Sequence, residues 1–287
     1  MTKIPDGLHT ITAKVAQHYE SKPDPTRYHL GASLIGHHCE RWIWLSFRWM
    51  VVEKIPGRIR RLFERGHREE QIMRAELEAI GCKFDRPAHE PQARVNLGGH
   101  VSGSLDGIIE SGLPGAEKTR HVVEFKTHND RSFKDLTRNA VRASKPQHWV
   151  QMQVYMHGTG AERALYYAVN KNDDEIYPER VRYDCEAAVY YIGRGKRLSV
   201  VDELPPPISD RPGWYQCKMC PAWALCHTGK TEDVQRTCRS CAWSTATPEG
   251  GWQCEKHGTT LTKQQQEAGC PDYEMHDHLA ELGNASA

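Results

Sequence analysis

Two short stretches, Gly103-Ser-Leu-Asp106-Gly107 and Val122-Val-Glu124-Phe-Lys126-Thr127, decide the fold and the chemistry that this sequence predicts. Side chains alternate between the two faces of a strand, so Glu124 and Lys126 share one face and Phe125 points to the other, into apolar surroundings. An Asp at a strand–turn junction beside this pair brings two carboxylates and one ammonium together. Hard divalent cations bind such carboxylates together with water and phosphate, and the bound ion can activate a water for attack on phosphorus. On these residues alone, an exposed Glu-x-Lys pair and an ordinary Asp-Gly turn remain the alternative.

Two further segments supply polar residues at helical spacing. Gln151 and Tyr155 are four positions apart, hence on one face of a helix. In Gly66-His-Arg-Glu-Glu70, an acid follows a glycine that costs about 1 kcal/mol relative to alanine inside a helix, so close packing is a sensible reason for it. The alternatives are a surface Gln/Tyr pair and a solvated Glu.

The composition bounds the class of protein. The 287 residues are 38% hydrophobic and 26% charged, which is enough apolar material for a buried core. Lys plus Arg (38) nearly equals Asp plus Glu (37), which excludes a polybasic tail but not local basic patches. The longest apolar run, Ala164 to Val169, is far too short to cross a membrane, and residues 1–20 show no secretion signal. We therefore expect a cytoplasmic protein without a membrane partner.

The periodic pattern predicts a mixed α/β fold. Helices are expected over 33–50, where Ser33 would be the N-cap, and over 61–80, which Gly81 would end. Further helices are expected over 131–158, with a break before Pro146, and over 186–201. Strands are expected over 100–110, 120–127, 163–170 and 177–183. This order implies a central mixed sheet flanked by helices. The proline-rich stretch 204–213 predicts a linker.

The order Gly66-x-x-x-Glu70, Ser104-Leu-Asp106-Gly107, Glu124-x-Lys126, Gln151-x-x-x-Tyr155 resembles the PD-(D/E)XK nuclease superfamily. It is similar to the RecB-like and lambda-exonuclease-like branch, which includes phage recombination exonucleases. The resemblance covers residues 66–155, and Leu105 stands where the family has its naming proline. It implies a restriction-endonuclease-like core.

That resemblance also implies roles for the individual residues. Asp106, Glu124 and the carbonyl of Phe125 would bind Mg²⁺ or Mn²⁺, and Lys126 would position the attacking water. Glu70 would hold the metal side of the site, Gln151 would support Lys126 or the scissile phosphate, and Tyr155 would brace its helix or contact DNA. His67 is a weaker candidate for metal or phosphate contact.

The cysteines form two groups in the last quarter of the chain. Cys217-Lys-Met-Cys220-Pro-Ala-Trp-Ala-Leu-Cys226 is a C-x2-C-x5-C array that needs a fourth ligand, and Cys39 is the distant candidate. A lone early Cys followed by C-x2-C-Pro and a last Cys resembles the 4Fe–4S arrangement of CRISPR-associated RecB-like exonucleases and AddB-type nuclease domains. The alternatives are a buried apolar thiol at Cys39, completion of the site by Cys238 or Cys241, and an electron-transfer centre. Cys82 and Cys185 are assigned to packing.

The second group predicts a zinc ribbon-like module. Its preferred Zn²⁺ ligands are Cys238, Cys241, Cys254 and Cys270, with His257 competing for the last place. A tail without apolar periodicity needs such a staple to fold. Reduced, solvent-exposed thiols are the alternative.

Basic residues suggest where DNA would lie. A stripe at helical spacing begins just after Lys126 and comprises Arg131, Lys134, Arg138, Arg142 and Lys145. A second basic run precedes Glu70 and comprises Arg58, Arg60, Arg61, Arg65 and Arg68. Cationic tracks supply most non-specific affinity for DNA. A solvated helix face is the alternative for either.

These observations predict a nuclease core over 1–203, a linker and iron–sulfur segment over 204–230, and a zinc-bound module over 231–287. The expected activity is metal-dependent hydrolysis of DNA, as an exonuclease on DNA ends in phage recombination or DNA processing. Such a protein would work in the host cytoplasm if phage-encoded, and a recombination partner protein is possible. Related exonucleases include rings that encircle DNA, so the resemblance also allows an oligomer. The competing class is a non-catalytic DNA-binding or assembly protein that retains the fold.

Overall fold

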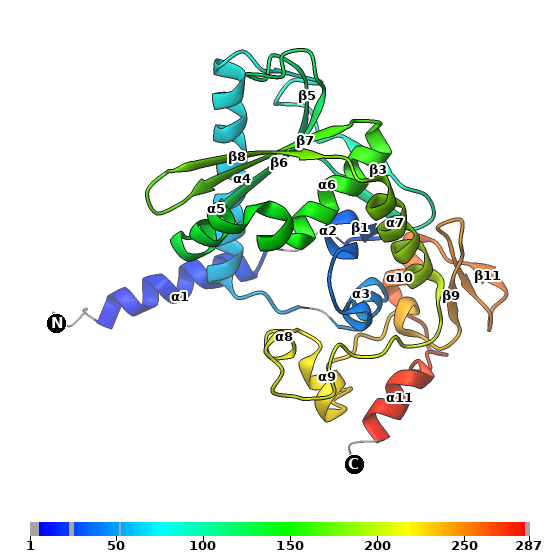
Figure 1. Cartoon of the computed structure of the whole chain (residues 1–287). Coiled ribbons are helices and arrows are strands. Elements are labelled where there is room, and N and C mark those ends of the chain that lie inside the picture. Colours follow the sequence, from blue (N-terminus) through cyan, green and yellow to red (C-terminus); the bar gives the residue numbers. More distant parts are fainter. Residues whose placement is uncertain (1–5, 23–25, 52, 285–287) are drawn as a thin grey trace.

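A five-stranded mixed sheet forms the centre of the molecule (Figure 1). The computed structural model describes residues 6–22, 26–51 and 53–284. The sheet order is β2-β5-β6-β7-β8, from strands β2 (Lys83–Phe84), β5 (Gly107–Ser111), β6 (His121–His128), β7 (Arg163–Asn170) and β8 (Ile176–Arg182). Only β6 and β7 run parallel within it, and they pair from Val122–Ala164 to His128–Asn170. The expected mixed sheet is therefore present.

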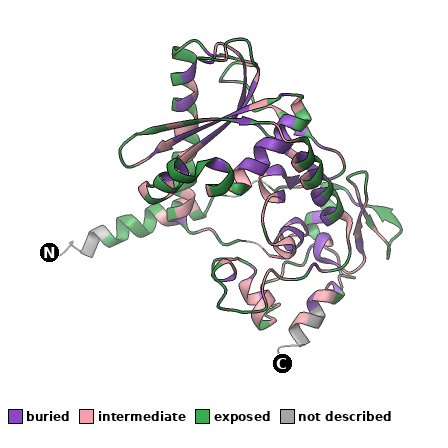
Figure 2. Cartoon of the chain, in the orientation of Figure 1, coloured by how far each residue is buried: buried purple, intermediate pink, exposed green. Residues whose placement is uncertain are grey.

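Helices cover both faces of this sheet. On one face, α4 (Gly57–Ala79) packs Met73 and Leu77 against Phe125 and Leu165. On the other face, α6 (Pro146–Thr159) is buried all round from Trp149 to Met156, because it lies between the even-numbered side of β6 and β7 and helices α2 (Ala32–Ile35) and α7 (Cys185–Val200). Figure 2 shows β6, β7 and α6 largely buried, whereas much of α1 (Asp6–Glu20) is exposed. The alternation along β6 thus decides which helix each side chain meets.

The helix expected over 33–50 is wrong, because the chain forms two short helices there. They are α2 (Ala32–Ile35), which begins after Gly31 and not at Ser33, and α3 (Glu40–Phe47). Between them, Gly36 packs so closely that an added Cβ would lie 2.9 Å from Cβ of Val150. Cys39 then adopts extended backbone as the N-cap of α3. Tertiary packing against α6 therefore interrupts an apolar pattern that reads as continuous.

A second small sheet lies beside the first and carries the strand before Asp106. It consists of β1 (Leu30–Gly31), β4 (Val101–Ser104) and β3 (Arg94–Asn96), in the order β1-β4-β3. The single strand expected over 100–110 is therefore two strands, β4 and β5, which belong to different sheets. Leu105 and Asp106 form the junction between them.

The crossover from β6 to β7 contains the break that the sequence predicts. Helix α5 (Asp130–Ser144) ends before α6, which begins at Pro146. Within α5 the backbone kinks at Ala140, whose φ is 58°. The uninterrupted helical face expected from Arg131 to Lys145 therefore ends at this kink, and Arg142 and Lys145 lie beyond it. Helix α7 (Cys185–Val200) follows β8 as expected.

The C-terminal part is more structured than its irregular sequence suggests. After α8 (Tyr215–Lys218) and α9 (Trp223–Thr228) come the 3-10 turn η1 (Cys238–Ser240) and a β11-β10-β9 sheet. That sheet comprises β9 (Ser244–Ala246), β10 (Trp252–Cys254) and β11 (Thr259–Thr260), and α10 (Lys263–Ala268) and α11 (Asp277–Asn284) complete the chain.

Buried arginines attach this part to the rest of the molecule. Arg239 is 1% exposed; its guanidinium lies 3.9 Å from the ring centroid of Trp49 and donates to the carbonyls of Phe47 and Tyr28. Arg48 donates to the carbonyl of Ser244 across the same boundary. Because a buried guanidinium is costly unless its donors are satisfied, these contacts fix the C-terminal part on the core.

Among the described residues, no helix combines the length and apolarity needed to cross a membrane.

Candidate active site and cysteine sites

The fold brings Asp106, Glu124 and Lys126 together at the junction between β4 and β5. Asp106 Oδ2 accepts a hydrogen bond of 2.9 Å from the backbone N–H of Phe125. The Lys126 ammonium forms an ion pair with Glu124, lies 3.9 Å from Asp106 Oδ2, and donates to the Phe125 carbonyl at 2.9 Å. Oxygen atoms of three residues therefore converge on one cationic position, which the lysine itself now fills.

Glu124 is the most unusual group in this site. Its side chain is 0% exposed, and among the described residues its carboxylate has no partner other than the Lys126 ammonium. Burial raises the pKa of Glu124, which the Lys126 ammonium opposes and the Asp106 carboxylate reinforces. Although burial alone would lower the pKa of Lys126, the adjacent Glu124 and Asp106 raise it, so the ammonium keeps its charge. A buried carboxylate with no donor beyond one ammonium has unused capacity to bind a cation.

A cavity of about 450 Å³ opens beside Asp106 and the backbone of Phe125. Helix α4 contributes Glu70 and His67 to its wall. Burial raises the pKa of Glu70, and the Asp106 carboxylate raises it further. Glu70 therefore interacts electrostatically with Asp106. The site thus gathers three carboxylates around one lysine, an excess of negative charge that favours cations.

Gln151 and Tyr155 brace the strand that precedes Asp106. The Tyr155 hydroxyl donates to the Ser104 carbonyl at 2.7 Å, and the Gln151 amide donates to that hydroxyl at 3.4 Å. An added Cβ on Gly103 would lie 2.6 Å from the Tyr155 ring, so only glycine fits there. The described contacts therefore favour bracing for Tyr155, and they join Gln151 to Tyr155, not to Lys126.

Sequence reasoning missed a polar cluster on the same face of the sheet. Tyr166 is the register partner of Glu124 on β7, and its hydroxyl lies 2.9 Å from both His128 Nε2 and His148 Nδ1. Burial, helped by the positive charges of Lys145 and Lys126, lowers the pKa of His128 to about 4; burial and then Lys126 lower that of His148 to about 3. Both imidazoles are neutral near pH 7. The period of two along β6, which puts His128 on the face of Glu124 and Lys126, is the signal that could have found His128.

The basic residues of the predicted DNA stripe are surface residues with acidic neighbours. Lys134 pairs with Asp130 at 2.8 Å, Lys145 with Asp135 at 3.1 Å, and Arg142 lies 3.8 Å from Asp184. Arg131 and Arg138 are exposed on α5. In the other run, Arg65 lies 3.6 Å from Glu69. Contact with DNA stays a prediction for both runs.

The four cysteines of the first group line one small cavity of about 30 Å³ between the α2–α3 loop and α8–α9. They are Cys39, Cys217, Cys220 and Cys226. Burial raises the pKa of the Cys220 thiol to about 11 and also raises those of Cys217 and Cys226, and the neighbouring thiols act in the same direction. Among the described residues, no three of these sulfurs lie within 4.8 Å of one another. The same is true of the sulfurs of Cys238, Cys241, Cys254 and Cys270, so the spacing of the sulfurs does not distinguish an iron–sulfur cluster from Zn²⁺ at either group.

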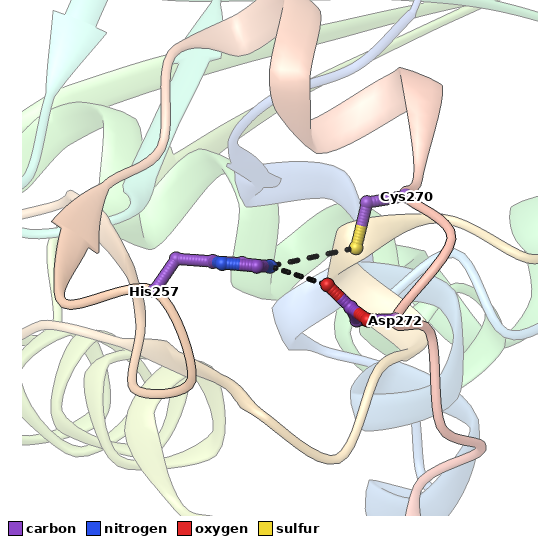
Figure 3. Close-up of side chains that lie close together, drawn as sticks. All are labelled: His257, Cys270 and Asp272. Carbon is purple, nitrogen blue, oxygen red and sulfur yellow. Dashed lines mark hydrogen bonds and ion pairs between the residues drawn. The ribbon is translucent and has the colours of Figure 1, made fainter.

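The second group surrounds a larger cavity of about 320 Å³ beside β10 and α10. Its wall contains all four predicted zinc ligands and His257. Figure 3 shows that His257, Cys270 and a residue not predicted, Asp272, point toward one another. His257 Nε2 lies 3.9 Å from Cys270 Sγ and 3.4 Å from Asp272 Oδ2. Sequence reasoning overlooked Asp272 because it considered only Cys and His as ligands.

Comparison with known proteins leaves this chain without an assigned family. No protein-family model and no curated protein matches it. Among solved structures, the crystal structure of SSO0001 matches with a TM-score of 0.43 and 14% identity, over 77% of this chain and 96% of that one. An alkaline exonuclease (LHK-Exo) from Laribacter hongkongensis matches with a TM-score of 0.41 and 15% identity, over 65% and 90%. Its complex with dAMP gives 0.38 and 15%, over 60% and 86%. At these low scores, function has to be argued from the site.

Proposed function

We propose that this protein is a metal-dependent deoxyribonuclease whose active site is built by Asp106, Glu124 and Lys126. The observation that carries the proposal is the Glu124 carboxylate, which is fully buried and whose one partner among the described residues is the Lys126 ammonium. A buried charge of this kind is costly, and sites that tolerate the cost are often functional.

The residues present fit a hard divalent cation. The Lys126 ammonium already marks a position that Glu124, Asp106 and the Phe125 carbonyl approach together. These oxygen donors would hold Mg²⁺ or Mn²⁺, which prefer such ligands. Glu70 from α4 would reach the ion through a water, because no three described carboxylates here lie within 4.8 Å of one another. When bound, the ion supplies charge stabilisation for a phosphoryl transition state and a more acidic water.

The chain's own groups divide the remaining tasks. Asp106 is oriented by the Phe125 N–H, and Tyr155 fixes the strand end just before it. Lys126 keeps its proton because two carboxylates surround it, so it can orient an attacking water or a phosphate oxygen but does not act as a base in this state. Action on DNA ends, in phage recombination or DNA processing, is the part of the proposal that rests on the motif resemblance.

Digestion of DNA tests the proposal. Labelled linear and closed circular DNA are incubated with Mg²⁺ or Mn²⁺ and with wild type, Lys126→Met, or the control Lys118→Met, an exposed lysine between β5 and β6. We expect metal-dependent loss of linear DNA with wild type and the control, and none with Lys126→Met. Equal digestion by all three proteins would refute the site, and loss of circular DNA would refute the exonuclease mode.

We further propose that Cys39, Cys217, Cys220 and Cys226 hold a 4Fe–4S cluster. The cavity that all four cysteines line supports a single shared site, and the choice of an iron–sulfur cluster rests on the motif resemblance. The cluster would link positions 39 and 217–226, and a cross-link of that length removes about 4–5 kcal/mol of denatured-chain entropy. Cys220→Ala should lose iron and stability together, whereas Cys185→Ala, at an exposed cysteine on α7, should keep both. A stable, iron-replete Cys220→Ala protein would contradict the assignment.

The C-terminal cavity is proposed to hold Zn²⁺ through Cys238, Cys241, Cys254 and Cys270. Burial raises the pKa of the Cys238 thiol, and the neighbouring cysteines raise it further, so a bound cation would be needed to keep Cys238 ionised. Metal analysis of His257→Ala and Cys270→Ser distinguishes the two candidates for the last ligand. Zinc should fall in Cys270→Ser only; a loss confined to His257→Ala would reverse the assignment.

A further inference from the structure

An exposed aromatic pair stands on the segment that carries the first cysteine group. Trp214 and Tyr215 are 40% and 67% exposed, and their ring centroids lie 5.1 Å apart at an interplanar angle of 51°. The indole N–H of Trp214 donates to Gln216 at 3.0 Å, which restrains the ring while it remains exposed. Adjacent exposed aromatic side chains often mark a surface that binds another molecule. We therefore expect a ligand to cover this pair.

The surrounding charge indicates which occupant fits. Arg211 and Lys218 flank the pair and are exposed, and residues 204–230 contain one further cation, Lys230, against the single acid Asp210. Met219, which is 87% exposed, extends the apolar part of the surface. Aromatic faces with adjacent cations suit a ligand that alternates bases and phosphates. A purely apolar protein partner would leave Arg211 and Lys218 without a role.

A groove adjoins the cavity that the first cysteine group lines. Gln216 and His38 both line the 30 Å³ cavity, and His38 also lines a neighbouring groove of about 740 Å³. That groove is lined further by Lys145, His148 and the 64% exposed Tyr190. His148 is close enough to Lys126 for the ammonium to lower its pKa.

The acids along this groove are matched by cations. Glu40 pairs with Arg194 at 2.9 Å and with Arg197 at 2.7 Å. The only other acid described in contact with a groove cation is Asp135, which pairs with Lys145. No unpaired carboxylate among the described lining residues therefore opposes a phosphate chain in this groove.

We propose that Trp214 and Tyr215 stack on bases of single-stranded DNA, with Arg211 and Lys218 on its phosphates, and that this strand continues along the groove toward Lys126. The inference rests on the proposed nuclease function and extends it to the form of the substrate. A duplex hides its base faces, whereas a single strand offers them to any aromatic platform. The platform would hold the strand on one side of the active site.

Equilibrium binding without catalysis tests the platform. Fluorescence anisotropy of a labelled oligodeoxythymidylate is measured with EDTA present, for wild type, Trp214→Ala/Tyr215→Ala, Trp214→Phe/Tyr215→Phe, and the control Ile176→Ala. Ile176 is 50% exposed at the start of β8. Because each stacked base contributes a factor of about 5 or more, we expect the alanine pair to weaken binding about 25-fold or more. The phenylalanine pair and the control should stay within about twofold.

The salt dependence provides a second, independent readout. Lys218→Ala should lower the slope of log affinity against log salt by about 0.7, the value for one phosphate contact on a single strand. Lys118→Ala, which removes an exposed lysine in the β5–β6 turn, should leave the slope unchanged.

Either of two results would overturn the platform. One is single-strand affinity unchanged in the alanine pair, and the other is an equal loss for blunt duplex DNA, which would indicate a partner surface or a general folding effect. Neither result depends on digestion, so the platform can fail while Lys126→Met still abolishes cleavage. Conversely, failure of the cleavage test would leave the binding difference measurable.

Discussion

The two faces of strand β6 differ more than any other pair of surfaces in the core. On the α4 side, Val123 and Phe125 meet Leu77 and Leu165 in an apolar cluster. On the α6 side, the same strand buries Glu124 beside Lys126 and the neutral His128. Apolar burial stabilises a fold, whereas buried charge costs stability unless it is well paired. The comparison therefore assigns stability to one face and chemistry to the other.

The largest expected effect comes from the polar face. Glu124→Gln should lower metal-dependent DNA cleavage by about 10²- to 10⁴-fold, the range of a lost charged group at a reaction centre. Its free energy of unfolding should stay within about 1 kcal/mol of wild type, because the easier burial of an amide offsets the lost ion pair and Asp106 remains 3.9 Å from the Lys126 ammonium. Urea denaturation and cleavage assays on the same preparation check both. A large loss of stability would show that Glu124 is a structural residue, and the two faces of β6 would then not differ in role.

The apolar face should behave in the opposite way. Leu77 is 3% exposed, so Leu77→Ala should lower the free energy of unfolding by about 2–5 kcal/mol. Cleavage per folded molecule should remain near the wild-type value, since Leu77 lies in the apolar cluster on the other face of β6. Ile80→Ala is the matched control, because Ile80 is 60% exposed at the end of the same helix; its effect should stay within about 0.5 kcal/mol. Lost cleavage in folded Leu77→Ala protein would show that the two faces are not separable.

A smaller effect concerns pH and the polar face. Burial lowers the pKa of His148 from 6.5 to about 3, so on acidification the unfolded chain takes up a proton before the folded one does. Stability from this group is thus complete above about pH 6.5 and declines as the pH falls, by about 2 kcal/mol at most down to pH 5. His148→Gln should reduce that decline in urea titrations at several pH values. His89→Gln, at an exposed position, should leave it unchanged; an unchanged slope in His148→Gln would contradict a buried neutral imidazole.

Much of the core could be predicted because its strands follow simple alternation. The pattern around Glu124 and Lys126 predicts β6 and its two faces, Pro146 predicts the break before α6, and the β7 range is confirmed. The sequence also pointed to Asp106 as the partner of this pair, and the fold brings the three side chains together. Local rules worked where strand period and proline geometry dominate.

Other features depend on contacts that no local pattern encodes. The split between α2 and α3 arises because Gly36 packs on Val150 of a helix distant in sequence. The kink in α5 occurs at Ala140, although alanine is not a helix-breaking residue. The Tyr166 hydroxyl joins His128 and His148 only because β7 lies parallel to β6. Asp272 likewise reaches His257 only through the fold of the C-terminal part.

Direct measurement of manganese binding tests the central claim, that Asp106 and Glu124 share one divalent ion beside Lys126. Electron paramagnetic resonance of free Mn²⁺ is recorded during titration of wild type and of Asp106→Asn/Glu124→Gln. The account predicts a Mn²⁺ site in wild type that is missing from the double variant, which remains folded. Equal Mn²⁺ binding by the two proteins would contradict it.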